Sequence, residues 1–250
     1  MSTPTWDLSL FGSIELRGPD PAAAERVLVQ PKHVALLAYL AVEGAGPRGL
    51  RFHRRDHLVG LLWPELDQEH ARASLRRVVH QIRGALGADV LTSRGDEELS
   101  VPEEMLGSDV ASFSRAIAED RLAAALELYR SDLMPGFHLA ECGQFQDWVD
   151  GRRMELRREA GAAAWTLAEV LERDGRGTIA GKWARRASEF SQDDERMVRR
   201  ALTMLERLGD RSGALHVFDD FARRLRREHG ASPSAETVAV ITRIREGAGR

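Results

Sequence analysis

Six residues that can contact nucleic acid lie within one short stretch of the sequence, Glu69–Gly87. They are the basic and amide side chains Arg72, Arg76, Arg77, His80, Gln81 and Arg83. Arginine forms paired hydrogen bonds with guanine, glutamine forms them with adenine, and arginine also binds phosphate. No acidic residue interrupts the stretch between His70 and Gly87. The residue types therefore favour contact with phosphates and base edges.

These residues need an element that presents them on one side, and the apolar residues between them predict a helix. The apolar residues recur at steps of three and four, the spacing of a helix face turned toward a core. They are Ala71, Leu75, Val78, Val79, Ile82 and Leu86. Gly87 supplies a C-terminal stop. The alternative is an ordinary solvated face. The helix alone does not distinguish this from a nucleic-acid-binding face, and the segments around it have to be considered.

Length and composition describe a globular protein. The chain has 250 residues, of which 43% are hydrophobic, and this length favours two domains. No apolar run approaches the roughly 20 residues that cross a bilayer. The first ten residues lack the basic and apolar segments of a signal peptide. We therefore expect a cytoplasmic protein without a membrane partner.

Charge is unevenly distributed although the net charge is only −3. Residues 48–94 hold nine arginines and five acids, whereas the rest of residues 1–107 holds three basic residues and ten acids. Arginine doublets also occur far from this region, so a doublet alone is no evidence of DNA binding.

Cys142 is the only cysteine, which excludes an internal disulfide and a cysteine-rich zinc site. We interpret it as a small buried residue.

The chain before the basic stretch is predicted to mix short strands with a buried helix. Asp7–Arg17 alternates apolar and polar residues around a glycine, which indicates a hairpin. Residues 18–26 are interpreted as a loop and Val27–Val29 as a short strand. Pro31–Val42 begins with proline and is almost wholly apolar, so it predicts a buried helix with His33 in a structural role.

The basic stretch has the neighbours of a winged helix-turn-helix. The glycine-rich segment Gly44–Gly49 ends the buried helix, and Arg54–Trp63 then predicts a short amphipathic helix stopped by Pro64. Two helices joined by a brief turn, the second one basic, form a helix-turn-helix. Asp89–Val101 predicts a hairpin that would serve as the wing, with Arg94 near its tip and able to enter a minor groove.

After Pro102 every segment is predicted to be helical. The helices expected from three-and-four spacing are Asp109–Ile117, Leu122–Tyr129, Cys142–Glu172, Thr178–Phe190, Asp194–Leu208, Ser212–His229 and Ala235–Glu246. Ala180 and Ala214 are 34 residues apart, the length of a tetratricopeptide unit. Only Thr178–His229 keeps this period, so the similarity to that repeat is partial.

Other candidate chemistry fails on inspection. Residues 175–183 resemble a phosphate-binding loop, but the glycine spacing is wrong and Trp183 replaces the magnesium-binding hydroxyl. His53 and His57 have the spacing of a zinc protease helix, but Arg54 replaces the glutamate that acts as base, so we interpret both histidines as surface groups. We expect no enzyme, and we nominate no catalytic residue, cofactor site or metal site.

The motifs together resemble a known family. Those that carry the likeness are, in order, HLVGLLWPE, ARASLRRVVHQIRGALGADVL, SRG, SDVASF, ALELYRSDLMPGF, FQDWVDGRRMEL and LRREHGASPSAET. This series resembles the SARP-type (antibiotic regulatory protein) bacterial transcriptional activators. The resemblance implies a mainly α protein, with an OmpR-like winged helix-turn-helix at residues 1–104. A tetratricopeptide-like bacterial transcriptional activator domain would follow at residues 105–250.

The resemblance also implies a function and its residues. Such a protein binds direct repeats in promoter DNA, often as two protomers, and recruits RNA polymerase. The segment Arg72–Arg83 would lie in the major groove, Thr92 and Arg94 match wing positions, and the turn at Trp63, Glu65 and Asp67 matches a loop presented to polymerase.

Two features depart from the family pattern and keep alternatives open. Asp96, Glu97 and Glu98 put negative charge in the wing, and residues 18–29 are longer and richer in alanine than the family suggests. One alternative is a helical-repeat scaffold whose winged domain does not bind DNA. Another is a regulator with a small molecule inside the helical domain.

Overall fold

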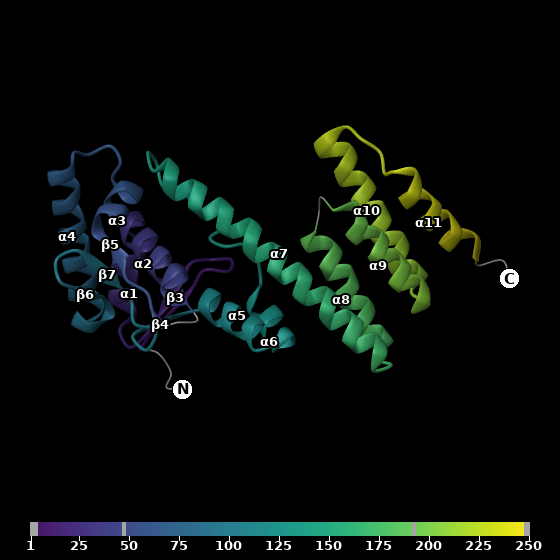
Figure 1. Ribbon diagram of the computed structural model, residues 1–250, viewed down its shortest axis with the longest axis horizontal. Coiled ribbons are helices and arrows are strands. Elements are labelled where there is room, and N and C mark those ends of the chain that lie inside the picture. The colour runs from purple at the N-terminus through teal and green to yellow at the C-terminus, as the bar shows by residue number, and fades with distance from the viewer. Residues whose placement is uncertain (1–4, 47–48, 192–193, 248–250) are drawn as a thin grey trace. The chain divides into compact units, whose positions relative to one another are not determined.

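The computed structural model describes residues 5–46, 49–191 and 194–247, which form two compact units. The first unit comprises residues 1–120 and 127–154, and the second comprises residues 121–126 and 155–250. The boundary falls inside the long helix α7 (Gly143–Arg173) (Figure 1). The fold is mainly helical with small sheets near the N-terminus, as predicted. The domain boundary expected after residue 104 stays a prediction.

The first sheet joins the start of the chain to a distant strand. β1 (Trp6–Ser9) and β2 (Glu15–Arg17) pair antiparallel, which confirms the hairpin. β8 (Leu106–Ser108) pairs parallel with the other edge of β1. We expected no strand after Pro102, and this was wrong. β8 has only three residues, and its sequence Leu-Gly-Ser has no diagnostic alternation because its pairing partner lies about a hundred residues away.

Residues 21–28 form a helix, α1 (Pro21–Leu28), so the predicted loop and short strand were both wrong. The Asp20 carboxylate accepts hydrogen bonds from the backbone N–H groups of Ala22 and Ala23, at 3.0 and 3.1 Å. Pro21 occupies the first turn, where its missing N–H has no consequence. A capping aspartate followed by proline is thus a helix start that the alanine-rich composition concealed.

The helix-turn-helix and its wing form as predicted. α2 (Pro31–Gly44) is buried over most of its length, and α3 (Arg55–Leu62) packs against α4 (Gln68–Leu86). A 3₁₀ turn, Ala88–Val90, separates α4 from the wing strands β6 (Thr92–Arg94) and β7 (Glu98–Ser100). The sequence did not reveal that β5 (His53–Arg54) adds a third strand, in the order β5-β7-β6.

Other elements complete the first unit. β3 (Ala45–Gly46) pairs with β4 (Gly49–Leu50); Pro47 and Arg48, which belong to the predicted helix break, lie outside the described residues. α5 (Asp109–Ala118) begins where β8 ends. The carboxylate of Asp109 accepts hydrogen bonds from the backbone N–H groups of Leu10 and Phe11, at 2.9 and 3.0 Å. This contact ties the end of β1 to α5.

In the described part of the second unit, every secondary-structure element is a helix. Its helices are α6 (Leu122–Leu128, its first five residues), the second half of α7, α8 (Gly177–Phe190), α9 (Glu195–Arg207), α10 (Arg211–His229) and α11 (Ala235–Glu246). Ala180 in α8 and Ala214 in α10 are both completely buried. Both small residues therefore sit where neighbouring helices approach, as the 34-residue spacing predicts.

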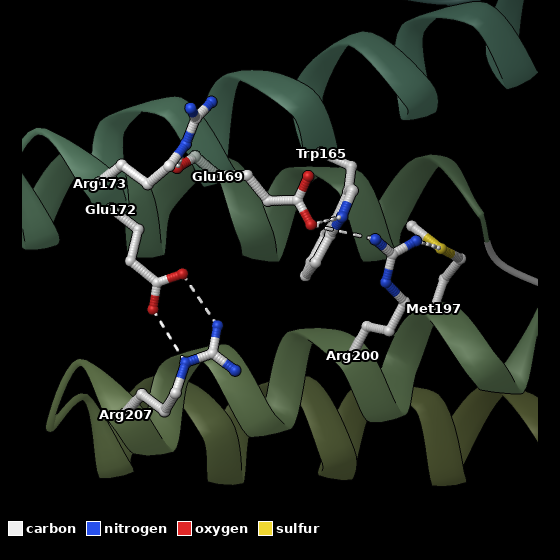
Figure 2. Close-up of polar contacts among 7 residues, drawn as sticks. All are labelled: Trp165, Glu169, Glu172, Arg173, Met197, Arg200 and Arg207. Atoms are coloured by element: carbon white, nitrogen blue, oxygen red, sulfur yellow. Dashed lines mark hydrogen bonds and ion pairs between the residues drawn. The ribbon is translucent and has the colours of Figure 1, made fainter.

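Ion pairs join α7 to α9 within this unit (Figure 2). The Arg207 guanidinium donates two hydrogen bonds to the Glu172 carboxylate, at 3.0 and 2.8 Å. Glu169 accepts one from the indole of Trp165 and one from Arg200, whose guanidinium also lies 4.1 Å from the centre of the Trp165 ring. The pairs are partly exposed, so each contributes little to stability.

Candidate nucleic-acid interface

Helix α4 presents one apolar face and one polar face. Its six predicted apolar residues are all buried, and the side chains of Arg76, Arg77, His80 and Gln81 are exposed on the other side. The Asp67 carboxylate caps the first turn by accepting from the backbone N–H of His70. Gly87 ends the helix with a φ of 111°, in the region that favours glycine. The predicted basic face therefore exists.

Two arginines of the six predicted contact residues, Arg72 and Arg83, already have partners inside the protein. Arg72 donates from Nε and Nη2 to both carboxylate oxygens of Asp56 in α3, each at 2.8 Å. Arg83 donates from Nε and Nη2 to the backbone oxygen of Leu91, at 3.1 and 2.7 Å. These contacts fix α4 against α3 and against the chain that leads into the wing.

The neighbouring pair, Arg76 and Arg77, differs from Arg72. Within the described part of the chain, neither guanidinium forms an ion pair or a side-chain hydrogen bond. Both side chains are exposed. Two positive charges on one turn of α4 thus lack a counter-charge from the described residues.

Arg55, which sequence reasoning missed, extends this positive surface. Its Nη2 donates to Ser93 Oγ in the wing at 3.1 Å, and Arg83 Nη2 donates to the same oxygen at 3.0 Å. Burial lowers the pKa of Arg55, and the nearby positive charges of Arg83 and Arg76 lower it further, against opposing effects of Asp96 and Glu97. Arg55 Nε is buried and has no hydrogen-bond partner among the described residues.

The guanidinium groups of Arg55 on α3 and Arg83 on α4 therefore meet at Ser93, and the charge of Arg76 is near enough to act on Arg55. A phosphate oxygen placed there would relieve their mutual repulsion and supply hydrogen-bond acceptors. No local sequence signal singled out Arg55, because its neighbours come from the later helix and from the wing.

The two wing residues predicted to contact DNA are partly engaged within the protein. Thr92 is half-buried in β6 opposite Ser100, and Arg94 pairs with the Glu98 carboxylate. The Arg94 guanidinium also lies 4.5 Å from the centre of the Phe52 ring. The ion pair neutralises one of the three wing acids, while Asp96 and Glu97 are exposed.

The turn between α3 and α4 divides into buried and exposed parts. Trp63 is only 6% exposed, with the Lys32 ammonium 5.2 Å from its ring centre. Glu65 forms an ion pair with Lys32 at 3.3 Å, and Asp67 is the helix cap. Leu66 is exposed at the tip. Trp63 thus anchors the turn, and the residues after it face outward.

The remaining candidates behave as structural groups, with one correction. Cys142 is buried and donates to the backbone oxygen of Leu62 at 3.2 Å, and burial raises the pKa of its thiol. His53 is buried against Tyr39, so our assignment of it to the surface was wrong. His57 hydrogen-bonds Tyr39 at 2.9 Å and is exposed. No group of three metal-binding side chains occurs among the described residues.

No helix within the described ranges has the length and hydrophobicity needed to cross a bilayer.

Comparison with solved structures supports the fold. The chain is similar to Mycobacterium tuberculosis EmbR, whose structure was solved in complex with a low-affinity phosphopeptide. The TM-score is 0.61 and the sequence identity 22%, over 98% of this chain and 66% of the EmbR chain. The present chain thus spans just under two thirds of that relative. No curated protein matches the sequence.

A family comparison identifies the C-terminal region. The model of the bacterial transcriptional activator domain matches residues 109–245, more than half of the chain. The family consists of transcriptional regulators rather than enzymes, and a transcriptional activator domain implies DNA binding. The chain therefore belongs to the bacterial transcriptional activator domain family, as its resemblance to the SARP-type activators predicted.

Proposed function

We propose that this protein is a sequence-specific transcriptional activator that places α4 in the major groove of promoter DNA. The observation that carries the proposal is the electrostatic coupling of the guanidiniums of Arg55, Arg76 and Arg83, together with Arg77 of the same helix, which has no counter-charge among the described residues. Like charges are thus held close to one another against their mutual repulsion. A DNA duplex is a polyanion, so its charge is opposite to that of the arginines, and an α-helix fits its major groove.

The contacts of each predicted DNA-binding residue within the protein indicate its role on DNA. Arg55 and Arg83, held by Ser93, bind phosphate and set the orientation of the protein. Arg76, Arg77, His80 and Gln81 are exposed and reach base edges. Arg72, held by Asp56, orients α4 and contacts the backbone at its N-terminal end. Thr92 and Arg94 approach the backbone and minor groove from the wing.

Activation requires contacts beyond DNA. We propose that two protomers bind direct repeats spaced by whole turns of the duplex, so that both face the same side. The exposed part of the turn between α3 and α4, Glu65–Asp67, contacts RNA polymerase, and Trp63 holds that turn in place. The helical second unit provides protomer contacts. The protein would act in the cytoplasm, where bacterial promoters are found.

The test is genomic footprinting with the full chain, followed by affinity measurements on the recovered site. We expect protection of two repeats and a linear fall of log affinity with log salt, by almost one in slope per phosphate neutralised. A control duplex of equal length and shuffled sequence should bind more weakly with a similar slope. Equal affinity for both duplexes would contradict sequence-specific binding.

A scaffold function is the competing proposal, favoured by the pairs Arg94–Glu98 and Arg72–Asp56, which neutralise cations that DNA would need. In that case α4 and the wing bind another protein. The same experiment separates the two functions, because a scaffold would show no salt-sensitive binding to any genomic fragment.

A further inference from the structure

Gln81 on the exposed face of α4 contacts a histidine from another helix. His33 is the third residue of α2 and is only 7% exposed. Its Nε2 lies 3.1 Å from Oε1 of Gln81, which is hydrogen-bond distance. Its other ring nitrogen, Nδ1, is buried without a hydrogen-bond partner among the described residues. The side chain with which Gln81 would read DNA is therefore attached at one end.

Because Nδ1 has no partner among the described residues, the donor in the His33–Gln81 hydrogen bond can be identified. If Nδ1 carried the proton, an N–H would be buried without an acceptor, which is rarely tolerated. If Nε2 carries the proton, it donates to Gln81 Oε1 and only a lone pair on Nδ1 is unpaired. Burial lowers the pKa of His33, against an opposing effect of this hydrogen bond, so the ring is neutral near pH 7. The imidazole then has one proton, on Nε2.

This contact fixes which end of the Gln81 amide faces outward. The oxygen points to His33, in a groove of about 460 Å³ that Val29, Gln30 and Gly84 also line. A base edge would have to enter this groove to reach the second lone pair of the oxygen. The NH2 group is left as the part of the amide directed to solvent.

We propose that His33 restricts Gln81 to donating hydrogen bonds, so that Gln81 selects a keto base, guanine or thymine. In the major groove guanine O6 and thymine O4 accept hydrogen bonds, whereas adenine N6 and cytosine N4 donate them. Paired recognition of adenine needs both the oxygen and the nitrogen of the amide. His33 is thus a positioning residue for specificity. The inference rests on the proposed function, in which α4 reads the major groove.

The first test measures base preference at one position. Affinities are measured for all four base pairs at each position of the recovered site, and Gln81→Ala identifies the position that Gln81 reads. Wild type should prefer a keto base there by about 2- to 10-fold, the value of one net hydrogen bond. His33→Phe keeps a ring but cannot donate, so the preference should move to adenine. His33→Gln restores a donor near Nε2 and should restore the keto preference.

The outcomes separate this inference from the proposed function. Wild-type preference for adenine, or an unchanged keto preference in His33→Phe, overturns the role of His33. Salt-sensitive binding in which Gln81→Ala alters no base preference overturns it as well, while the proposed function stands. Absence of salt-sensitive binding by wild type overturns both.

A second measurement does not depend on DNA or on the folding of a variant. Long-range ¹H–¹⁵N spectra of the full chain report which ring nitrogen of His33 carries the proton. We expect the proton on Nε2 near pH 7. A proton on Nδ1, or a rapid average of both forms, would overturn the inference.

Discussion

Arginines of a single helix have different roles in this molecule. Arg72 and Arg83 are held by Asp56 and by the Leu91 carbonyl, whereas Arg76 and Arg77 have no counter-charge among the described residues. The sequence predicted which face these residues share, because helical spacing is local. It did not predict their partners, since Asp56 and the wing are separate in sequence. For the same reason Arg55 and the contact of His33 with Gln81 were not foreseen.

Arg72 provides a prediction about positioning. Arg72→Ala should weaken DNA binding by a similar factor at every sequence, because loss of the Asp56 contact lets α4 shift against α3. Competition binding to a panel of single-base variants of the recovered site measures this. Asp56→Ala, which removes both acceptors of Arg72 and leaves Arg72 itself in place, is the control and should also lower the affinity by a similar factor at every sequence. A change in preference at one base pair would instead show that Arg72 reads a base.

Asp109 provides a prediction about pH. Burial raises the pKa of its carboxyl, although hydrogen bonds from the Phe11 and Leu10 N–H groups oppose the shift. The native state therefore binds this proton more tightly than the unfolded chain does. Its contribution to the free energy of unfolding should rise as the pH falls through the native pKa and level off below the unfolded pKa. Urea unfolding over a pH series tests this.

Variants of Asp109 isolate its contribution. Asp109→Asn should remove this part of the pH dependence. Asp109→Ala should lower the free energy of unfolding by about 3 kcal/mol, because two buried backbone donors lose their acceptor. The prediction fails if Asp109→Asn has the same pH profile as wild type.

At the scale of elements, α4 is held at both ends by contacts that the sequence did not display. Trp6 in β1 donates from its indole to the backbone oxygen of Leu86, at 2.8 Å, and so satisfies a terminal carbonyl of the helix. The elements themselves were predictable where capping and periodicity were strong, as in α4 and α10. α1 and β8 were missed, because the first looks like a loop in composition and the second depends on distant pairing.

Gly18 tests how Trp6 supports α4. A Cβ atom at residue 18 would lie 2.2 Å from the Trp6 ring, closer than atoms approach. Gly18→Ala should therefore displace the ring and lower the free energy of unfolding by about 1–3 kcal/mol. Trp6 fluorescence during urea unfolding, in a variant that keeps this tryptophan alone, would measure it. Gly84→Ala, where nothing lies within 4 Å, is the matched control and should not destabilise. Equal effects of the two substitutions would contradict the account.

The helical unit provides a comparison between packing and ion pairing. Ala214→Leu should lower the free energy of unfolding by about 1–3 kcal/mol, because the site is completely buried and has no room for the added atoms. Glu172→Gln, which breaks the partly exposed pair with Arg207, should cost less than about 1 kcal/mol. Thermal and urea unfolding of both variants measure this order. The reverse order would mean that ion pairs rather than buried contacts stabilise the unit.

At the scale of the whole molecule, the chain combines a basic helix-turn-helix with a helical unit. The family match at residues 109–245 begins close to the predicted domain boundary, while the packing units divide inside α7. Composition and periodicity could predict the two kinds of structure. They could not predict that β8 and part of α7 would complete the first unit, because that depends on contacts between distant segments.

The most direct test of the central claim compares two arginine doublets on exposed helix faces. The variant Arg76→Ala/Arg77→Ala should bind the recovered promoter site at least about tenfold more weakly and with a shallower salt slope. The control Arg226→Ala/Arg227→Ala removes the same charge from α10 and should bind like wild type. Equal losses in both variants, or wild-type affinity in the first, would contradict the claim that α4 reads DNA.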